Sequence, residues 1–349
     1  MKILFLVRYA ANGGSSRYRF LQFFDYFKEK KVDFSSQSFF SEKYIIEKYS
    51  GKKISAFYLL GRYILRCLVI FKVWRFDLVV IEKEIFPSLP VFFEKLIYFF
   101  NKNWIVDYDD AVYVLYEGKK LLENKISEVI KLSKAVTVAN ENLFDYAKKF
   151  NANVYLIPDA LDSDKYSNKE NYDSGEKIII GWTGSPATMK FLDVISGCLQ
   201  KMAKETPIIL RCIGISNFNI AGVEVENIKW EEEKEPGVIK TFDIGIMPLT
   251  DDPFSRGKSG LKIIQYFAAG IPAVASPVGW NKNIIINGEN GFLANSEAEW
   301  EKYLKLLIED KKLREIIGQA GRRAFEKKFI FSKIAPELLN VYYSLAKQV

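Results

Sequence analysis

The sequence predicts an α/β protein built from two Rossmann-like domains that face each other across a cleft. Short β-branched or aromatic runs alternate with longer helical patterns along the chain, which is typical of parallel sheets covered by helices. The strand runs are almost uninterruptedly apolar, as in sheets that are buried on both faces. Because 349 residues exceed what one core usually organises, two domains are expected.

The first domain is expected to span residues 1–163 and to contain five strands. A polar, turn-rich segment from Asp162 to Lys177, with almost nothing to bury, is the best linker candidate. The expected strands are KILFLVRY from Lys2, DLVVIEK from Asp77, WIVDYDD from Trp104, AVTVAN from Ala135 and VYLIPDA from Val154.

The second domain is expected to span residues 164–330 and to contain six strands. Residues 331–349 are then left for a carboxy-terminal helix that crosses back to the first domain. The expected strands are KIIIGWTGS from Lys177, PIILRCIG from Pro207, a run from Val223 to Trp230, FDIGIMPL from Phe242, IPAVASPVG from Ile271 and GFLA from Gly291.

Composition excludes several classes of chemistry. The chain contains no histidine, so Ser-His-Asp hydrolysis, His-based zinc chemistry and histidine phosphotransfer are excluded. Cys67, Cys198 and Cys212 lie far apart, which argues against a zinc site or a disulfide framework. The amino-terminal run ILFLV is too short for a secretory signal, so a cytoplasmic protein is expected.

A net charge of +7 favours anionic partners such as nucleoside diphosphates, phospholipid surfaces or nucleic acid. The segment Ser41–Phe76 carries eight Lys or Arg against two Glu, interleaved with aromatic residues. It suits a surface helix on anionic lipid, or an amphipathic helix packed on the first sheet. Nucleic acid is not expected, because the pattern matches no recognition module.

A strong candidate site is the stretch RGKSGLKIIQYFAAG, which predicts a helix beginning after Ser259-Gly260 and ending at Gly270. Unpaired amides at a helix start suit an anion, and nearby cations strengthen that preference. The stretch therefore predicts a diphosphate clamp with Gln265 reaching a ribose or base; the alternative is a solvated basic loop. The proposed clamp residues are Arg256, Lys258, Lys262, Ser259, Gly260, Leu261 and Gln265.

A second helix start follows the strand KIIIGWT. Gly181, Thr183 and Gly184 precede Ser185-Pro186, which resembles an N-cap with proline at the first helical position. Strand, glycine loop and capped helix together let backbone approach a phosphate, although a plain tight turn fits equally well.

Polar residues also follow the strands of the first domain. Gly13, Gly14, Ser15, Arg17 and Arg19 come after the first strand and indicate an anion or acceptor site, or a simple turn. In the DYDD run, Asp109 and Asp110 favour an acceptor-side or structural network over a metal site. Asn140 and Asp159 also fall at strand ends and are weaker candidates.

The carboxy-terminal half resembles glycosyltransferase family 4, the glycosyl transferases group 1, which has the GT-B fold. The resemblance rests on GWTGSPATMKFL, on FDIGIMPLTDDPFSRGKSGLKIIQYFAAGIPAVASPVGWNKNIIINGENGFLA and on DKKLREIIGQAGRRAFEKKF. The amino-terminal half fits more loosely, through GGSSRYR, WIVDYDDAVY, VTVANENLFDYA and LIPDALD.

This resemblance implies a retaining, metal-independent transferase of the hexosyltransferase type, with no cofactor. The donor would be a UDP- or GDP-sugar, and the acceptor a glycan or lipid-linked molecule in surface polysaccharide or glycolipid synthesis. The location would be cytoplasmic, peripheral on the inner face of the plasma membrane.

The sequence also departs from the family pattern. The two family glutamates fall on Gly257 and Gln265, a usual arginine falls on Trp182, and Lys190 is the only match for a usual lysine. The family histidine is missing, and whether Asp109 or Asp110 acts in its region stays open. A nucleotide-sugar epimerase or hydrolase and a non-catalytic sugar- or lipid-binding protein therefore remain alternatives.

Overall fold

The computed structural model describes residues 1–346 and divides into two compact units. The first unit contains Met1–Asp159, the short segment Gly257–Ser259 and the chain from Ile334 onward. The second unit contains Ala160–Arg256 and Gly260–Lys333. Each unit holds one six-stranded sheet whose paired strands are parallel, so the expected α/β fold with two Rossmann-like domains is confirmed.

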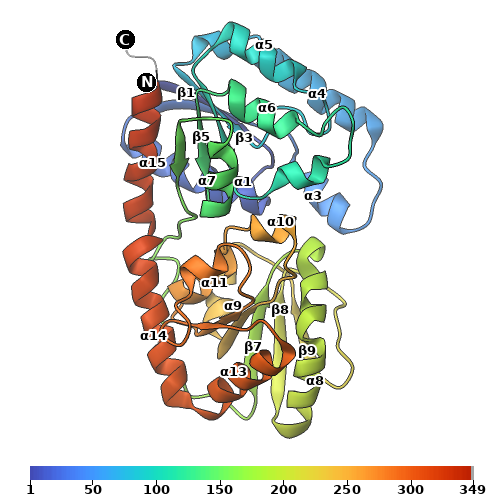
Figure 1. The fold of residues 1–349 in the computed structure, drawn as a ribbon, viewed down its shortest axis with the longest axis vertical. Helices are drawn as coiled ribbons and strands as arrows, with labels where there is room; N and C mark the ends of the chain where they lie inside the picture. The colour runs from blue at the N-terminus through green and yellow to red at the C-terminus, as the bar shows by residue number, and fades with distance from the viewer. Residues whose placement is uncertain (347–349) are drawn as a thin grey trace. The chain divides into compact units, whose positions relative to one another are not determined.

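The sheet of the first unit has the strand order β2-β1-β3-β4-β5-β6, and its strands β1, β3 and β5 are labelled in Figure 1. Its register is set by pairs such as Ile3 with Leu78 and Val79 with Trp104. The sequence analysis missed β2 because DFSSQS is polar and lies at the exposed edge, where no apolar run is required. The strands are β1 (Lys2–Val7), β2 (Asp33–Ser38), β3 (Leu78–Glu82), β4 (Trp104–Tyr108), β5 (Ala135–Val138) and β6 (Val154–Leu156).

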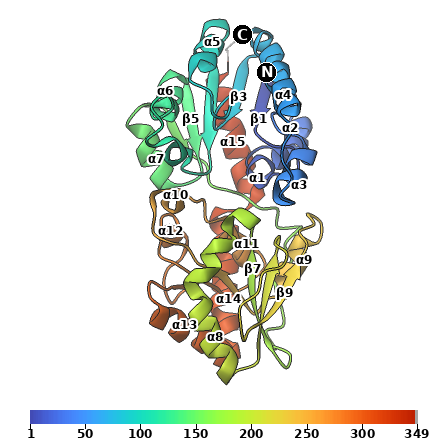
Figure 2. The same ribbon diagram turned by 90° about the vertical axis from the view of Figure 1, so that its right-hand side faces the viewer.

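Helices cover both faces of this sheet, and the last helix of the chain, α15 (Phe331–Leu345), packs on it (Figure 2). The Tyr342 ring lies 5.9 Å from the Phe5 ring and 6.0 Å from the Phe27 ring. These contacts bury aromatic surface that β1 alone would leave exposed. The other helices are α1 (Gly14–Arg19), α2 (Phe24–Glu29), α3 (Glu42–Tyr49), α4 (Ala56–Ile70), α5 (Phe92–Phe100), α6 (Lys125–Leu132) and α7 (Glu141–Lys148).

The sheet of the second unit has the order β12-β11-β10-β7-β8-β9. Buried Trp182 and Trp300 belong to the core that packs helices against it. The strands are β7 (Ile178–Thr183), β8 (Ile208–Ile213), β9 (Glu224–Ile228), β10 (Ile244–Met247), β11 (Ala273–Ala275) and β12 (Phe292–Leu293). The helices are α8 (Ser196–Glu205), α9 (Glu235–Lys240), α10 (Pro253–Arg256), α11 (Leu261–Ala268), α12 (Asn281–Ile284), α13 (Glu297–Glu309) and α14 (Lys311–Lys328).

The segment expected as a linker with little to bury differs from that expectation. Tyr166 and Tyr172 are buried in the second unit, and the Tyr172 hydroxyl donates to the Gly270 carbonyl at 2.6 Å. Arg314 donates to the Tyr172 carbonyl at 3.0 Å. The two tyrosines therefore fix a polar segment that has no regular secondary structure.

Among residues 1–346, no helix is both long enough and apolar enough to cross a membrane.

A buried carboxyl lies under α5. Glu94 is fully buried, accepts a hydrogen bond from the Ile85 amide at 3.2 Å and has the Lys125 ammonium 4.0 Å away. Lys125 is closer to Glu84, with which it forms a buried ion pair. Burial raises the pKa of Glu94 to about 7, and the nearby Lys125, which also pairs with Glu84, offsets this rise only in part.

We expect Glu94→Gln to flatten the pH dependence of stability. A carboxyl whose pKa rises from 4.5 in the unfolded chain to about 7 on folding destabilises the fold increasingly as pH rises through that interval. Urea denaturation at pH 5 and at pH 8 should show a smaller loss of unfolding free energy for the variant than for the wild type. The exposed control Glu42→Gln should behave like the wild type, and equal pH slopes for Glu94→Gln and wild type would contradict the assignment.

Candidate functional site

The polar residues that follow the strands of the first unit meet at one edge of its sheet. The carboxyl ends of parallel strands share an edge, which is where α/β sheets place ligands. Ser15 follows β1, Lys83 follows β3, Asp109 and Asp110 follow β4, and Asn140 follows β5. The structure thus brings together residues that are separated by up to 125 positions in the sequence.

Lys83 is the centre of this cluster, and the sequence analysis did not identify it. Its ammonium lies 2.8 Å from an Asp109 oxygen, 3.4 Å from an Asp110 oxygen and 3.1 Å from the Ser15 hydroxyl. Burial opposes the charge on each group. The carboxylates nevertheless raise the pKa of Lys83, and Lys83 lowers the pKa of Asp109 below its usual value.

The backbone conformation of Lys83 is a second indication that this position is functional. Its φ of 64° lies in the left-handed region, which costs free energy for a residue with a side chain. This strained conformation follows β3 directly. A sequence signal existed, because a charged EKE run directly follows an apolar strand, but charge alone does not distinguish a site from a surface turn.

The segment Gly257–Ser259 contributes Lys258 to the same cluster. The Lys258 ammonium lies 3.8 Å from an Asp110 oxygen, and the Asn140 side-chain amide donates to the Gly257 carbonyl at 2.8 Å. A Cβ on Gly257 would lie 2.4 Å from the Ala111 Cβ, so only glycine permits this close approach. Ser259 donates to Asp159, which links the end of the segment to the strand end after β6.

The other predicted residues of the first unit have mainly internal partners. Arg19 binds both oxygens of Asp107, at 3.0 and 2.7 Å, and also the Ile157 carbonyl at 2.7 Å. Asn140 caps α7 by accepting from the Leu143 amide at 2.9 Å. Arg19 thus joins β4 to the chain after β6, and Asn140 joins the start of α7 to the segment Gly257–Ser259.

Gly13 and Gly14 differ from each other. A Cβ on Gly13 would lie 2.2 Å from the Tyr9 Cβ, whereas a Cβ on Gly14 would meet no atom within 4 Å. Arg17 is buried, with its guanidinium 4.6 Å from the Tyr18 ring. Only Gly13 of the two glycines is therefore required by packing.

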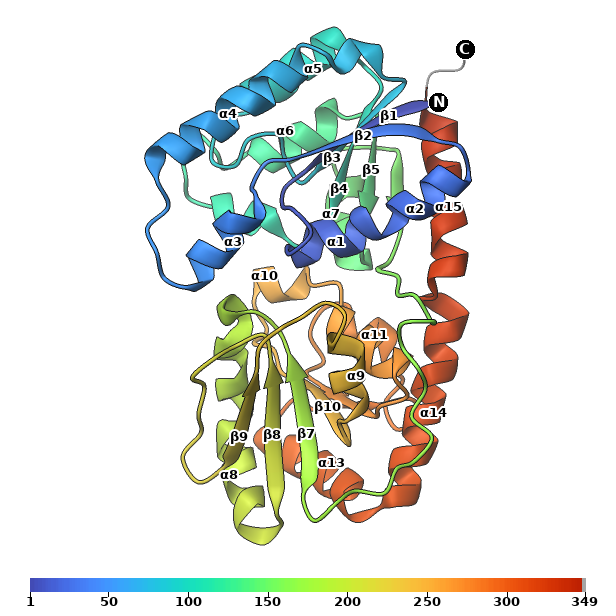
Figure 3. The same ribbon diagram turned by 180° about the vertical axis from the view of Figure 1, so that it is seen from behind.

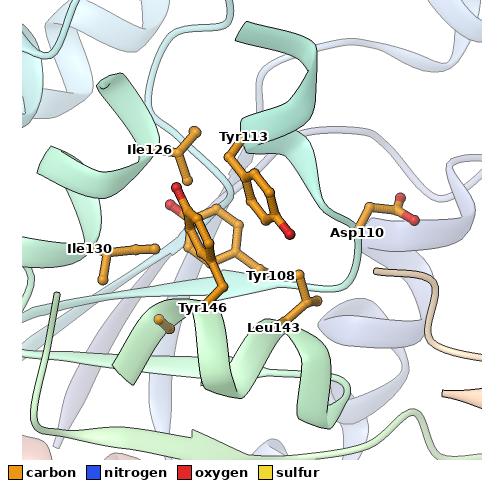
Figure 4. Close-up of a pocket in the computed structure, with 8 residues that line it drawn as sticks. Tyr108, Asp110, Tyr113, Ile126, Ile130, Leu143 and Tyr146 are labelled. Carbon is orange, nitrogen blue, oxygen red and sulfur yellow. The ribbon is translucent and has the colours of Figure 1, made fainter. Parts of the chain in front are cut away.

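A narrow aromatic hollow borders the cluster (Figure 4). Tyr108, Tyr113 and Tyr146 line it, and the rings of Tyr113 and Tyr146 stack with centroids 3.7 Å apart. The Asp110 carboxylate stands at its margin and points away from the tyrosine rings (Figure 4). The charged cluster and the hollow are thus adjacent but chemically distinct.

In the second unit, the glycine loop after β7 is explained mainly by packing. A Cβ on Gly181 would lie 1.9 Å from the Phe242 ring, and one on Gly184 would lie 2.4 Å from the Trp182 ring. Thr183 donates to buried Glu235 at 2.9 Å. The Ser185 amide donates to Thr188 at 3.1 Å in a capping box, so the expected helix start is present as a 3₁₀ helix, Pro186–Ile195.

Helix α11 begins and ends where the sequence predicted. Gly260 precedes Leu261 with a φ of 74°, which a glycine adopts without strain, and Gly270 follows the helix with a φ of 71°. The Lys262 ammonium lies 5.5 Å from the centre of the Trp182 ring. Gln265 is buried and donates to the Tyr166 hydroxyl at 3.1 Å.

The three cations of the predicted clamp have different partners. Arg256 is more than half exposed and pairs with Asp251 at 2.6 Å within the second unit. Lys258 pairs with Asp110 in the first unit, and Lys262 faces Trp182 in the second. The sequence spacing placed them on one stretch of chain, but side-chain packing gives each a separate environment.

Comparison with known proteins identifies the family that the second unit resembles. Residues 226–324 match the family model described as Glycosyl transferases group 1. The spore coat protein SA of Bacillus subtilis is 30% identical over 112 residues, covering 30% of either chain. The capsular polysaccharide biosynthesis glycosyltransferase CapM of Staphylococcus aureus is 25% identical over 204 residues, covering 54% of this chain and 52% of CapM.

The chain thus spans about a third to a half of the length of these curated relatives. Among solved structures, Anabaena Alr3699/HepE in complex with UDP and glucose has a TM-score of 0.72 and 14% identity, covering 99% of this chain and 100% of HepE. Together with the family match, this likeness confirms the resemblance to group 1 glycosyltransferases and the GT-B fold.

We expect Lys83→Met to lower the unfolding free energy of the first unit by about 3–5 kcal/mol at pH 7, because two carboxylates lose their shared buried cation. Lys83 stabilises ionised Asp109, whose pKa is lowered from 3.8, so the loss should shrink as pH falls below about 4. Urea denaturation at pH 7 and pH 3.5 measures both effects. The exposed control Lys204→Met should change little, and a loss below about 1 kcal/mol for Lys83→Met would show that the cluster is not tightly coupled.

Proposed function

We propose that this chain, whose second unit carries the group 1 glycosyltransferase sequence on a GT-B fold, transfers a sugar from a UDP- or GDP-activated donor with retention of configuration. We propose a glycan or lipid-linked acceptor used in surface polysaccharide or glycolipid synthesis on the cytoplasmic side of a membrane. The name of CapM and the UDP and glucose bound to HepE support this choice of substrates.

The start of α11 is the observation that carries the proposal. It lies inside the matched region, follows a left-handed glycine and carries Lys262 in its first turn. The first amides of a helix and its positive end favour a phosphate, and Lys262 adds a full charge. The Trp182 ring beside Lys262 restricts where this ammonium can lie.

This arrangement suits departure of a nucleoside diphosphate. As the bond to the sugar breaks, negative charge grows on the β-phosphate, and fixed donors aimed at that charge lower the barrier. We propose that the departing phosphate accepts the proton of the attacking hydroxyl, so that no histidine is required. Transfer by this route needs no cofactor and no side chain that acts as a general acid or base near pH 7.

The cluster of the first unit is proposed as the acceptor side. Asp109, Asp110 and Ser15 offer oxygen atoms to sugar hydroxyls, and Lys258 offers an ammonium donor. We propose that the reaction is metal-independent, because the Lys83 ammonium already lies between the two carboxylates. Among residues 1–346, no group of three Cys, Asp or Glu side chains is arranged to hold a metal ion.

Acceptor-dependent release of nucleoside diphosphate tests the proposal. Purified protein is incubated with radiolabelled UDP- and GDP-sugars, with and without lipid-linked and glycan acceptors. Release that requires an acceptor, with label transferred to it, supports transfer. A changed sugar without release would indicate an epimerase, and binding without either outcome would indicate a non-catalytic binding protein.

We expect Lys262→Ala to lower kcat by about 100- to 1000-fold, the usual cost of removing one donor to a developing oxyanion. The free energy of unfolding of the variant should stay within about 1 kcal/mol of the wild-type value, because Lys262 is only half-buried. Lys204→Ala, at an exposed position of α8, is the matched control and should retain activity. Equal activity of the two variants would exclude Lys262 from the donor site.

We expect Gly257→Ala to reduce turnover about tenfold or more, because a 2.4 Å contact with Ala111 must displace the segment that carries Lys258. Gly237→Ala is the matched control, since its new Cβ would meet no atom within 4 Å. Steady-state kinetics at saturating donor measures the effect. Wild-type acceptor KM and kcat in Gly257→Ala would contradict a role for this segment.

A further inference from the structure

Helix α4 has its two arginines facing the protein and apolar residues on both of its faces. Ile70 is buried and Tyr63 packs against the core, while another row of apolar side chains is exposed. Arg66 is buried and donates to the Val7 carbonyl at 2.7 Å and to the Gln37 carbonyl at 3.1 Å. Arg62 donates to the carbonyls of Ser38 and Phe39. The two arginines therefore fix which face of α4 points outward.

The outward face of α4 is apolar along its whole length. Most of its exposed large apolar residues recur every three or four positions, which is the spacing of one face of a helix. Phe57 is 87% exposed, although burial of a phenylalanine normally stabilises a fold. The exposed apolar residues of α4 are Phe57, Leu60, Ile64, Leu65 and Leu68, and the exposed Phe71 follows the helix directly.

Helix α5 lies near α4 (Figure 3), and ring contacts connect the exposed residues of the two helices. The Phe71 ring lies 5.9 Å from the Phe100 ring, which in turn lies 5.4 Å from the Phe99 ring. Phe99 is 79% exposed, and Trp74 and Phe92 are also exposed. We use the name α4–α5 surface for the exposed apolar residues of α4 and α5 together with Phe71 and Trp74, which lie between the two helices. Contiguous apolar surface of this kind marks an interaction site.

Within the two segments that carry the α4–α5 surface, Lys48–Phe76 and α5, the exposed charges have one sign. From Lys48 to Phe76 the sequence contains no Asp or Glu. On α5, the acidic residue Glu94 is buried. The exposed cations of the two segments are Lys48, Lys52, Lys53, Lys72, Arg75 and Lys95, and the exposed Lys102 follows α5 by two residues.

We propose that the α4–α5 surface inserts into the interfacial region of an anionic lipid bilayer. Exposed Phe, Leu, Ile and Trp enter the acyl boundary, while the flanking lysines and arginines contact lipid phosphates. A second copy of this chain is a less favourable partner for the α4–α5 surface, because pairing two such surfaces would bring their lysines and arginines together and the positive charges would repel. The biological use of the surface, bringing the enzyme to a lipid-linked acceptor, rests on the proposed function. Membrane binding itself can be measured without it.

Vesicle co-sedimentation of the full chain tests this proposal. Phosphatidylcholine vesicles with and without phosphatidylglycerol are compared, and circular dichroism confirms that each variant is folded. Wild type should bind vesicles that contain phosphatidylglycerol, and Phe57→Ser with Phe99→Ser should weaken that binding about tenfold or more. Lys52→Glu with Lys53→Glu should weaken binding to anionic vesicles only.

Matched controls lie in the second unit. Ile64→Ser in α4 is compared with Ile316→Ser in α14, because these side chains are 52% and 51% exposed. Lys327→Glu with Lys328→Glu controls for loss of charge, since both lysines are exposed. The α4 variant should lose binding and the second-unit variants should keep it.

The proposal would be overturned if the wild type did not bind phosphatidylglycerol vesicles, or if the control variants lost as much binding as the α4 variants. It would also be overturned if sedimentation velocity showed a dimer that Phe57→Ser with Phe99→Ser dissociates while vesicle binding stays unchanged. Turnover of the double variant with a water-soluble acceptor separates this question from catalysis. Retained turnover with lost vesicle binding supports the surface, whereas vesicle binding by a protein without turnover would refute only the proposed function.

Discussion

Compensation of buried charge at the carboxyl edge of the first sheet is the constraint on which the candidate site depends. Asp107, Asp109 and Asp159 are buried where strands end, and ionised carboxylates are costly there without cations. Arg19 compensates Asp107 and Asp159, and Lys83 compensates Asp109. Each cation follows a different strand from the one that carries or precedes its partner, so these ion pairs also fix how the chain continues after the strands.

This constraint separates supporting residues from residues that can contact a substrate. The Arg19 guanidinium binds Asp107, Asp159 and the Ile157 carbonyl, so Arg19 supports the site through buried contacts. Asp110 and Lys258 are less buried and are joined at 3.8 Å, a longer separation than the other pairs. A substrate hydroxyl or phosphate can compete more easily for this pair than for the buried ones.

Helix α4 shows a related use of buried charge. Arg66 donates to carbonyls at the ends of β1 and β2, so a polar contact adds to the apolar contacts of Tyr63 and Ile70 in fixing the inward face of α4. The apolar face is thereby left for another partner. Amphipathic periodicity reveals the two faces of a helix, but it does not reveal which one is turned toward the protein.

Features that depend on residues close together in the sequence were predictable, whereas contacts between residues far apart in the sequence were not. All strands except β2, the glycine after α11 and the capped start after β7 each depend on residues near one another in the chain, and the sequence predicted them. The edge strand β2 was missed because its polar residues carry no burial signal.

The sequence by itself determined two parallel-sheet domains, the absence of histidine chemistry and the basic segment before α11. Only the tertiary structure decided that Lys83 lies between Asp109 and Asp110 and that Gly257–Ser259 joins the first unit. It also decided that Arg256, Lys258 and Lys262 take different partners. The reason is that hydrophobic periodicity follows from neighbours in the chain, whereas charge pairing depends on which strand ends packing brings within a few ångströms.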